Sequence, residues 1–134
     1  MKRELQDTYT LDELRSIVAD LRGPEGCPWD RAQDYVSIKT CLKDETQEVL
    51  DAVDRMDIEN LKEELGDLLL QVIFYAQMAE EDGLFSLDDV MNGLGRKLVR
   101  RHPHVFGDEK AYTPEEALAL WRSVKKKERE EGFR

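Results

Sequence analysis

The sequence predicts an all-α protein, a helical bundle of about five helices that forms a single domain over residues 1–134. Apolar residues recur every three or four positions in five segments, helix-start residues precede several of them, and no segment has the pattern of a β-strand. The chain is long enough for one hydrophobic core and too short for two ordinary domains. The helices are expected at residues 11–22, 37–55, 58–81, 86–101 and 114–130.

The start of the first helix is marked by Thr10, a good N-cap, with Glu13 three residues later to complete a capping box. The segment that follows this helix, residues 23–30, contains two glycines and two prolines and is expected to be a loop. Trp29 in this loop is expected to pack as a lid over a hydrophobic edge, or else to form the wall of a pocket.

The third helix is the most apolar part of the chain. Asp57 is its expected N-cap, Asp82 and Gly83 end it, and residues 65–79 are apolar on nearly all sides. A helix without a polar face is buried on several sides. In a domain of this size, that predicts a central helix or a subunit interface.

Two further helix boundaries are marked in the C-terminal part of the sequence. Ser86, followed by Asp89, is expected to begin the fourth helix, and residues 101–104 end it. Thr113 is the expected N-cap of the last helix, with Pro114 and Glu116 at the first and third helical positions.

Composition restricts the classes of function. A net charge of −10 argues against nucleic acid as the main partner, because binding to a duplex requires a basic face. Only the C-terminal third is basic. The two cysteines, Cys27 and Cys41, are typical of thiols in a cytoplasmic protein and do not form a disulfide framework. No signal peptide or membrane span is expected.

Two pairs of carboxylates are the strongest candidates for chemistry. Glu45 and Glu48 are three positions apart, as are Glu64 and Asp67, so each pair lies on one face of its helix. A carboxylate on an apolar face is unfavourable unless something pairs with it, and two such pairs indicate a divalent cation. The apolar neighbours expected for Glu45 are Leu42, Val49, Ala52, Val53 and Met56, and those expected for Glu64 are Leu61, Leu68 and Tyr75.

Ligands that are all oxygen favour Mg²⁺, Mn²⁺ or Ca²⁺ over zinc. We expect Mg²⁺, with Mn²⁺ as a possible substitute. A di-iron bundle requires Glu-x-x-His pairs, and neither His102 nor His104 follows a glutamate at that spacing. The alternative is that these carboxylates are ordinary solvated helix faces, as most such patterns are in a chain that is 37% charged.

A basic group accompanies the acidic one. Lys97 and Arg101 are four positions apart, and so are Trp121 and Lys125. Cations are needed to neutralise those oxygens of a polyphosphate that a metal does not contact, and Trp121 can stack on a base or sugar. The pattern therefore fits a nucleoside triphosphate bound through Mg²⁺. The alternative is that Lys97 and Arg101 form surface salt bridges.

Four longer strings resemble the MazG-type nucleoside triphosphate pyrophosphohydrolases, a family of all-α enzymes. They are Gly26-Cys27-Pro28-Trp29-Asp30, Asp44-Glu45-Thr46-Gln47-Glu48-Val49, Glu63-Glu64-Leu65-Gly66-Asp67-Leu68-Leu69 and Arg100-Arg101-His102-Pro103-His104-Val105-Phe106. By this resemblance the metal ligands are Glu45, Glu48, Glu64 and Asp67, and the substrate-binding residues are Lys97, Arg101, Trp121 and Lys125. Asp44 departs from the family pattern, which usually has glutamate there.

The resemblance implies hydrolysis of ribo- and deoxyribonucleoside triphosphates between the α and β phosphates, giving a nucleoside monophosphate and pyrophosphate. Glu45 or Glu48 is the implied general base, with Lys97 and Arg101 completing the catalytic group. Many relatives carry two such domains, so this chain is expected to act as a homodimer or tetramer. A different class of function stays open, a non-catalytic helical interaction or regulatory module that retains a structural metal site.

Overall fold

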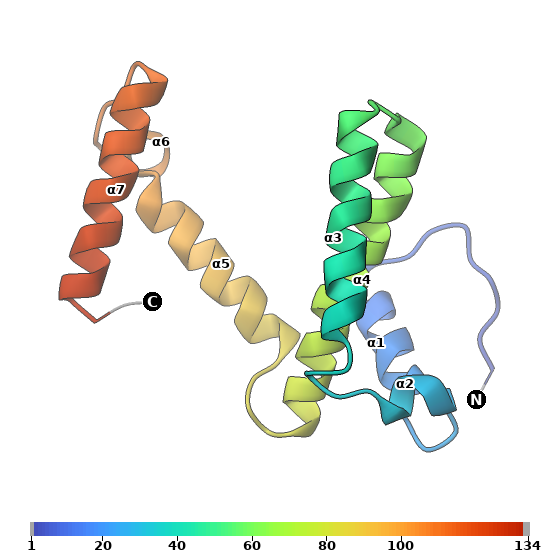
Figure 1. The fold of residues 1–134 in the computed structure, drawn as a ribbon. Coiled ribbons are helices and arrows are strands. Elements are labelled where there is room, and N and C mark those ends of the chain that lie inside the picture. Colours follow the sequence, from blue (N-terminus) through green and yellow to red (C-terminus); the bar gives the residue numbers. More distant parts are fainter. Residues whose placement is uncertain (1, 133–134) are drawn as a thin grey trace. The chain divides into compact units, whose positions relative to one another are not determined.

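The computed structural model describes residues 2–132 and is built from helices, with no strand among these residues (Figure 1). The predicted all-α class is confirmed. Residues 2–132 contain seven helices where about five were expected. Their bounds are α1 Leu11–Leu21, α2 Pro28–Ala32, α3 Lys39–Asp54, α4 Ile58–Glu81, α5 Leu87–Arg101, α6 Pro103–Phe106 and α7 Pro114–Glu130.

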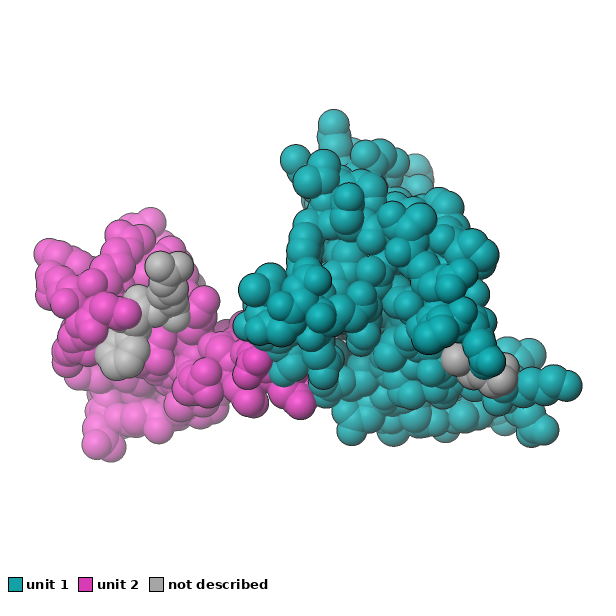
Figure 2. All heavy atoms as spheres, turned by 90° about the horizontal axis from the view of Figure 1, so that it is seen from below, with its two compact units in different colours: residues 1–87 teal, residues 88–134 magenta. Residues whose placement is uncertain are grey.

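The chain divides into two compact units (Figure 2), residues 1–87 and residues 88–134. The first unit contains α1 to α4, and the second contains nearly all of α5 together with α6 and α7. Each unit is described separately below.

The first helix begins as its sequence predicts. The Thr10 hydroxyl accepts a hydrogen bond from the Glu13 backbone N–H, and the Glu13 carboxylate accepts one from the Thr10 backbone N–H, so the capping box is complete. Val18 on α1 is buried, and α1 packs against α4.

The predicted loop over residues 23–30 is wrong in its second half, because α2 begins at Pro28. Proline is favourable at the first helical position, where a backbone N–H has no partner within the helix. Gly26 is needed just before this helix, since a Cβ there would lie 2.2 Å from the Leu21 carbonyl oxygen. Trp29 is exposed within the first unit.

Arg22 connects three helices of the first unit. Its guanidinium donates two hydrogen bonds to the Glu81 carboxylate, at 2.9 and 3.0 Å, and others to the carbonyl oxygens of Asp30 and Gln33. It also lies over the Phe74 ring, 5.3 Å from its centroid. These contacts fix the end of α1 and the short α2 against the C-terminal end of α4.

Helices α3 and α4 pack side by side (Figure 1). Ala52 of α3 is fully buried, which allows the two backbones to come close. The predicted apolar face of α3 extends too far, because Val53 and Met56 are exposed. Met56 lies beyond the last helical residue, Asp54, and has a positive φ of 52°.

The long helix α4 has its predicted ends, with Asp57 accepting a hydrogen bond from the Asn60 backbone N–H and Gly83 in the left-handed region at φ 71°. Its apolar residues are not all buried within the chain. Leu65, Leu69 and Val72 are 42–48% exposed and share one side of the helix. None of the described helices combines the length and apolar character needed to cross a membrane.

The second unit begins where the sequence predicts a helix, and α7 has the expected Thr113 cap, which accepts a hydrogen bond from the Glu116 backbone N–H. The short helix α6 was not predicted, because residues 101–104 were interpreted only as the end of α5. Pro103 occupies the first position of α6, in the same way as Pro28 does in α2.

We predict that the protein self-associates through the side of α4 formed by Leu65, Leu69 and Val72, because exposed apolar stripes mark interfaces. Light scattering at micromolar concentration is expected to give the mass of a dimer or tetramer. Replacing Leu65 and Leu69 together by lysine is expected to give a monomer, whereas Glu59→Lys, at an exposed position on another side of the same helix, leaves the mass unchanged. A wild-type monomer contradicts the prediction.

Candidate metal centre

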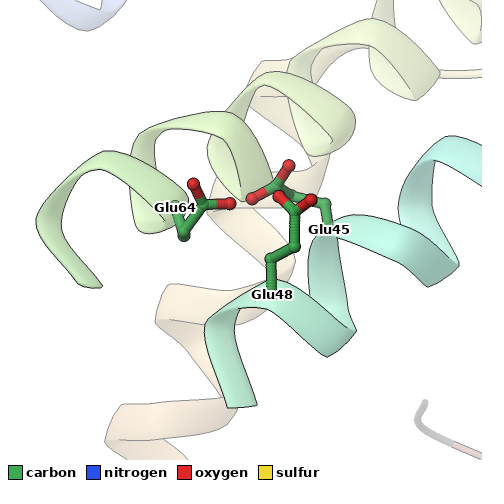
Figure 3. A group of neighbouring side chains, drawn as sticks. All are labelled: Glu45, Glu48 and Glu64. Atoms are coloured by element: carbon green, nitrogen blue, oxygen red, sulfur yellow. The ribbon is translucent and has the colours of Figure 1, made fainter. Parts of the chain in front are cut away.

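Helices α3 and α4 bring three glutamate side chains together in the first unit. Glu45 and Glu48 come from α3 and Glu64 comes from α4, and Figure 3 shows their carboxyl groups pointing toward one another. Each offers a carboxylate oxygen, and these oxygens all lie within 4.8 Å of one another. Three of the four predicted metal ligands are therefore neighbours.

Local structure explains this arrangement. Glu45 and Glu48 are one helical turn apart on α3, so both side chains leave the helix on the side that faces α4. Glu64 lies one turn and a half into α4, on the side that faces α3. The close packing of the two helices then brings the three carboxyl groups to one point.

Burial is what makes this group different from a solvated helix face. Glu64 is 7% exposed, as predicted from its apolar neighbours, and Glu45 is half-buried. Glu45 Oε1 and Glu64 Oε2 are buried and have no hydrogen-bond partner within the described part of the chain. Since buried carboxylate oxygens are unfavourable without a donor or a cation, these atoms fit a divalent metal ion.

The pKa values of all three carboxyl groups are raised above the ordinary glutamate value. Burial is the main cause for Glu45, with the charges of Glu48 and Asp67 acting in the same direction. The pKa of Glu48 is raised foremost by its hydrogen bond and charge interaction with Glu64, and that of Glu64 foremost by its hydrogen bond with Glu45. A cation that binds here would remove this mutual repulsion.

Asp67 belongs to a second, overlapping group. It lies with Glu63 and Glu64, again with one carboxylate oxygen from each within 4.8 Å of the others. Glu64 is thus common to both groups, while Glu63 and Asp67 are exposed. Glu63 was not predicted as a site residue, although its spacing of four residues from Asp67 places both on one side of α4.

The predicted basic residues lie in the second unit. Arg101 of α5 and Lys125 of α7 both lie over the Trp121 ring, with the Arg101 Cζ 5.6 Å and the Lys125 Nζ 4.8 Å from its centroid. These are distances at which cations interact favourably with an indole. Lys97 is half-buried on α5, one helical turn before Arg101.

One residue of this group was not predicted from the sequence. Glu128 of α7 is buried, and its carboxylate accepts hydrogen bonds from both Arg100 and Arg101. The Arg101 Nε and Nη2 atoms lie 3.1 and 3.0 Å from Glu128 Oε2. Arg101 therefore forms a salt bridge, the alternative considered for it, although its partner is a buried glutamate. Nothing in the sequence around Glu128, which is rich in lysine and arginine, indicated this pairing.

A family profile and several known proteins are similar to this chain. The profile of the MazG nucleotide pyrophosphohydrolase domain matches residues 33–106, which include both carboxylate groups of α3 and α4. A nucleoside triphosphate pyrophosphohydrolase of Escherichia coli K12 is 50% identical over 120 residues, covering 89% of this chain and 46% of that protein. Uncharacterized protein YabN of Bacillus subtilis is 45% identical over 129 residues, covering 96% of this chain and 26% of YabN.

A solved structure agrees in fold. The crystal structure of a MazG-related protein from Thermotoga maritima has a TM-score of 0.71 and 31% identity, covering 87% of this chain and 99% of that one. The chain spans less than half the length of the curated relatives it matches. With the family profile, the identity to named relatives and the shared fold all in agreement, the chain belongs to the MazG nucleotide pyrophosphohydrolase family.

Proposed function

We propose that the protein hydrolyses nucleoside triphosphates between the α and β phosphates in a reaction that depends on Mg²⁺, with Mn²⁺ as a substitute. The observation that carries the proposal is the group of Glu45, Glu48 and Glu64, in which two buried carboxylate oxygens lack a partner within the described residues. The named pyrophosphohydrolase relatives supply the reaction.

The ion would be held by Glu45, Glu48 and Glu64, with Asp67 as the further ligand predicted from the sequence. A bound Mg²⁺ supplies charge neutralisation at the phosphate oxygens and increases the acidity of water. Carboxylate oxygen is the donor type that this ion prefers.

The general base is Glu45 or Glu48, and exposure favours Glu48. Glu48 is exposed, whereas Glu45 directs a buried oxygen into the carboxylate group. In the proposed step a water attacks the α phosphorus, the bond to the bridging oxygen of the β phosphate breaks, and Glu48 accepts the proton of the water. The products are a nucleoside monophosphate and pyrophosphate.

We assign Lys97, Arg101 and Lys125 to the phosphate oxygens, where their charge stabilises the leaving pyrophosphate. Trp121, which was expected to stack on a base or sugar, has a second role beside these cations. Its ring interacts with Arg101 and Lys125 and orders both cations, in addition to any contact with a base or sugar.

The first prediction tests the activity itself. With Mg²⁺ and a panel of ribo- and deoxyribonucleoside triphosphates, the protein is expected to release pyrophosphate and the monophosphate. EDTA is expected to abolish the release. Release of orthophosphate instead points to a phosphatase, and absence of any release with every triphosphate favours the non-catalytic module that retains a structural metal.

A second prediction concerns the metal. Glu64→Gln keeps the shape of the side chain and removes one of three crowded charges. In EDTA this variant is expected to melt at or above the wild-type temperature, because a like-charge repulsion is gone. It is also expected to gain little from millimolar Mg²⁺, which stabilises only a folded state that binds it. Glu80→Gln on the same helix, outside both carboxylate groups, is the matched control and should keep the full Mg²⁺ shift.

The same melts have a defined pH dependence. The folded pKa of Glu64 is raised above its ordinary value of 4.5, so the folded state binds more protons than the unfolded state in the range above that value. Stability in EDTA therefore falls as pH rises from about 4.5 through the raised pKa. The advantage of Glu64→Gln should grow over this range. If Glu64→Gln melts well below wild type in EDTA and keeps the full Mg²⁺ shift, Glu64 is not a ligand of the metal.

A third prediction concerns the phosphate-binding cations. Lys97→Ala is expected to lower kcat/KM for a triphosphate by about tenfold or more, with the melting temperature nearly unchanged. Lys97 tests this role more cleanly than Arg101, whose replacement also breaks the ion pair with buried Glu128. Lys110→Ala, an exposed lysine in the same unit, is the control. Wild-type kcat/KM in the Lys97 variant contradicts the assigned role.

A further inference from the structure

The second unit contains a buried carboxylate that the proposed reaction does not use. The Glu128 side chain is 4% exposed, whereas those of its partners Arg100 and Arg101 are 30% and 18% exposed. Hydrogen bonds from Arg100 and then from Arg101 hold the pKa of Glu128 below its ordinary value. The residue is therefore a buried anion between two guanidinium groups that reach toward the surface.

Such an arrangement needs a reason beyond stability. A buried ion pair is often no more stabilising than apolar residues of similar size, because both charges lose their hydration. What it does supply is a restricted orientation, since a guanidinium that donates two hydrogen bonds to one carboxylate turns less freely than one without a partner.

Two hydrogen bonds of this kind hold Arg101, and they converge on one carboxylate oxygen. The Arg101 Nε and Nη2 atoms both contact Glu128 Oε2, at 3.1 and 3.0 Å, so the donors of Nη1 lie outside this ion pair. The same guanidinium is 5.6 Å from the centroid of the Trp121 ring, on whose ring Lys125 also lies. Glu128 is one turn of α7 after Lys125 and two turns after Trp121, so a single helix supplies all of these contacts.

We propose that Glu128 is a positioning residue, which fixes the Arg101 guanidinium beside Trp121 and Lys125 in the orientation that binds triphosphate oxygens. This role rests on the proposed function of Arg101. Without the Glu128 carboxylate, Arg101 retains its charge but loses its fixed orientation, and the ordering must then be achieved when the substrate binds.

The test is a double-mutant cycle in the full chain with Glu128→Gln and Arg101→Ala, measured with the triphosphate that the wild type hydrolyses fastest. Glu128→Gln alone is expected to lower kcat/KM by about tenfold. In the Arg101→Ala background it is expected to lower it further by no more than about twofold, because its effect passes through Arg101. The control is Glu130→Gln, an exposed glutamate on the same helix, which should leave kcat/KM unchanged.

A purely structural Glu128 gives a different result. It predicts equal losses of activity with and without Arg101, and that outcome overturns the proposal. All assays are made at a temperature at which circular dichroism shows each variant to be folded. If Glu128→Gln does not fold, Glu128→Asp takes its place. This variant keeps the negative charge but moves it away from Arg101 by the length of one methylene, and the same results are expected.

A second measurement separates this proposal from the proposed activity. Trp29→Phe leaves Trp121 as the single tryptophan of the chain. In that background Glu128→Gln and Arg101→Ala are each expected to change the Trp121 emission, and the double variant should match Arg101→Ala. If the wild type hydrolyses no triphosphate, the proposed function fails and this emission cycle still tests the positioning. Unchanged Trp121 emission in Glu128→Gln overturns it.

Discussion

The close packing of α3 against α4 is the constraint on which the candidate metal centre depends. Ala52 is fully buried in α3, and Glu45, Glu48 and Glu64 meet where the two helices face one another. The same packing buries Glu64 and leaves carboxylate oxygens without a partner in the described residues. Helix packing therefore creates a local repulsion that a divalent cation is suited to relieve.

The two units differ in charge in a way that matches their assigned chemistry. Residues 1–87 contain more than twice as many acidic as basic residues, whereas residues 88–134 contain slightly more basic ones. The carboxylate groups belong to the first unit. In the second, Arg101 and Lys125 lie against the Trp121 ring, and Glu128 forms ion pairs with Arg100 and Arg101.

The family motif acquires a physical meaning at several positions. Gly26 is required because any side chain there would collide with the Leu21 carbonyl, and Pro28 begins a helix. Glu64 is common to both carboxylate groups, so its replacement alters both. Arg101 combines an ion pair with a contact to an aromatic ring, a combination that lysine cannot reproduce at the same geometry.

The sequence by itself determined the all-α class, most helix ends and three of the carboxylates that are neighbours in the candidate metal centre, because caps and side-chain spacing act within one or two helical turns. It did not determine that α2 and α6 are helices, since the prolines were interpreted as breaks and not as first helical residues. Only the tertiary structure decided that Val53, Met56 and one side of α4 are exposed, and that Glu128 holds Arg101. Burial and ion pairing between residues far apart in the chain depend on how helices pack, which local spacing does not encode.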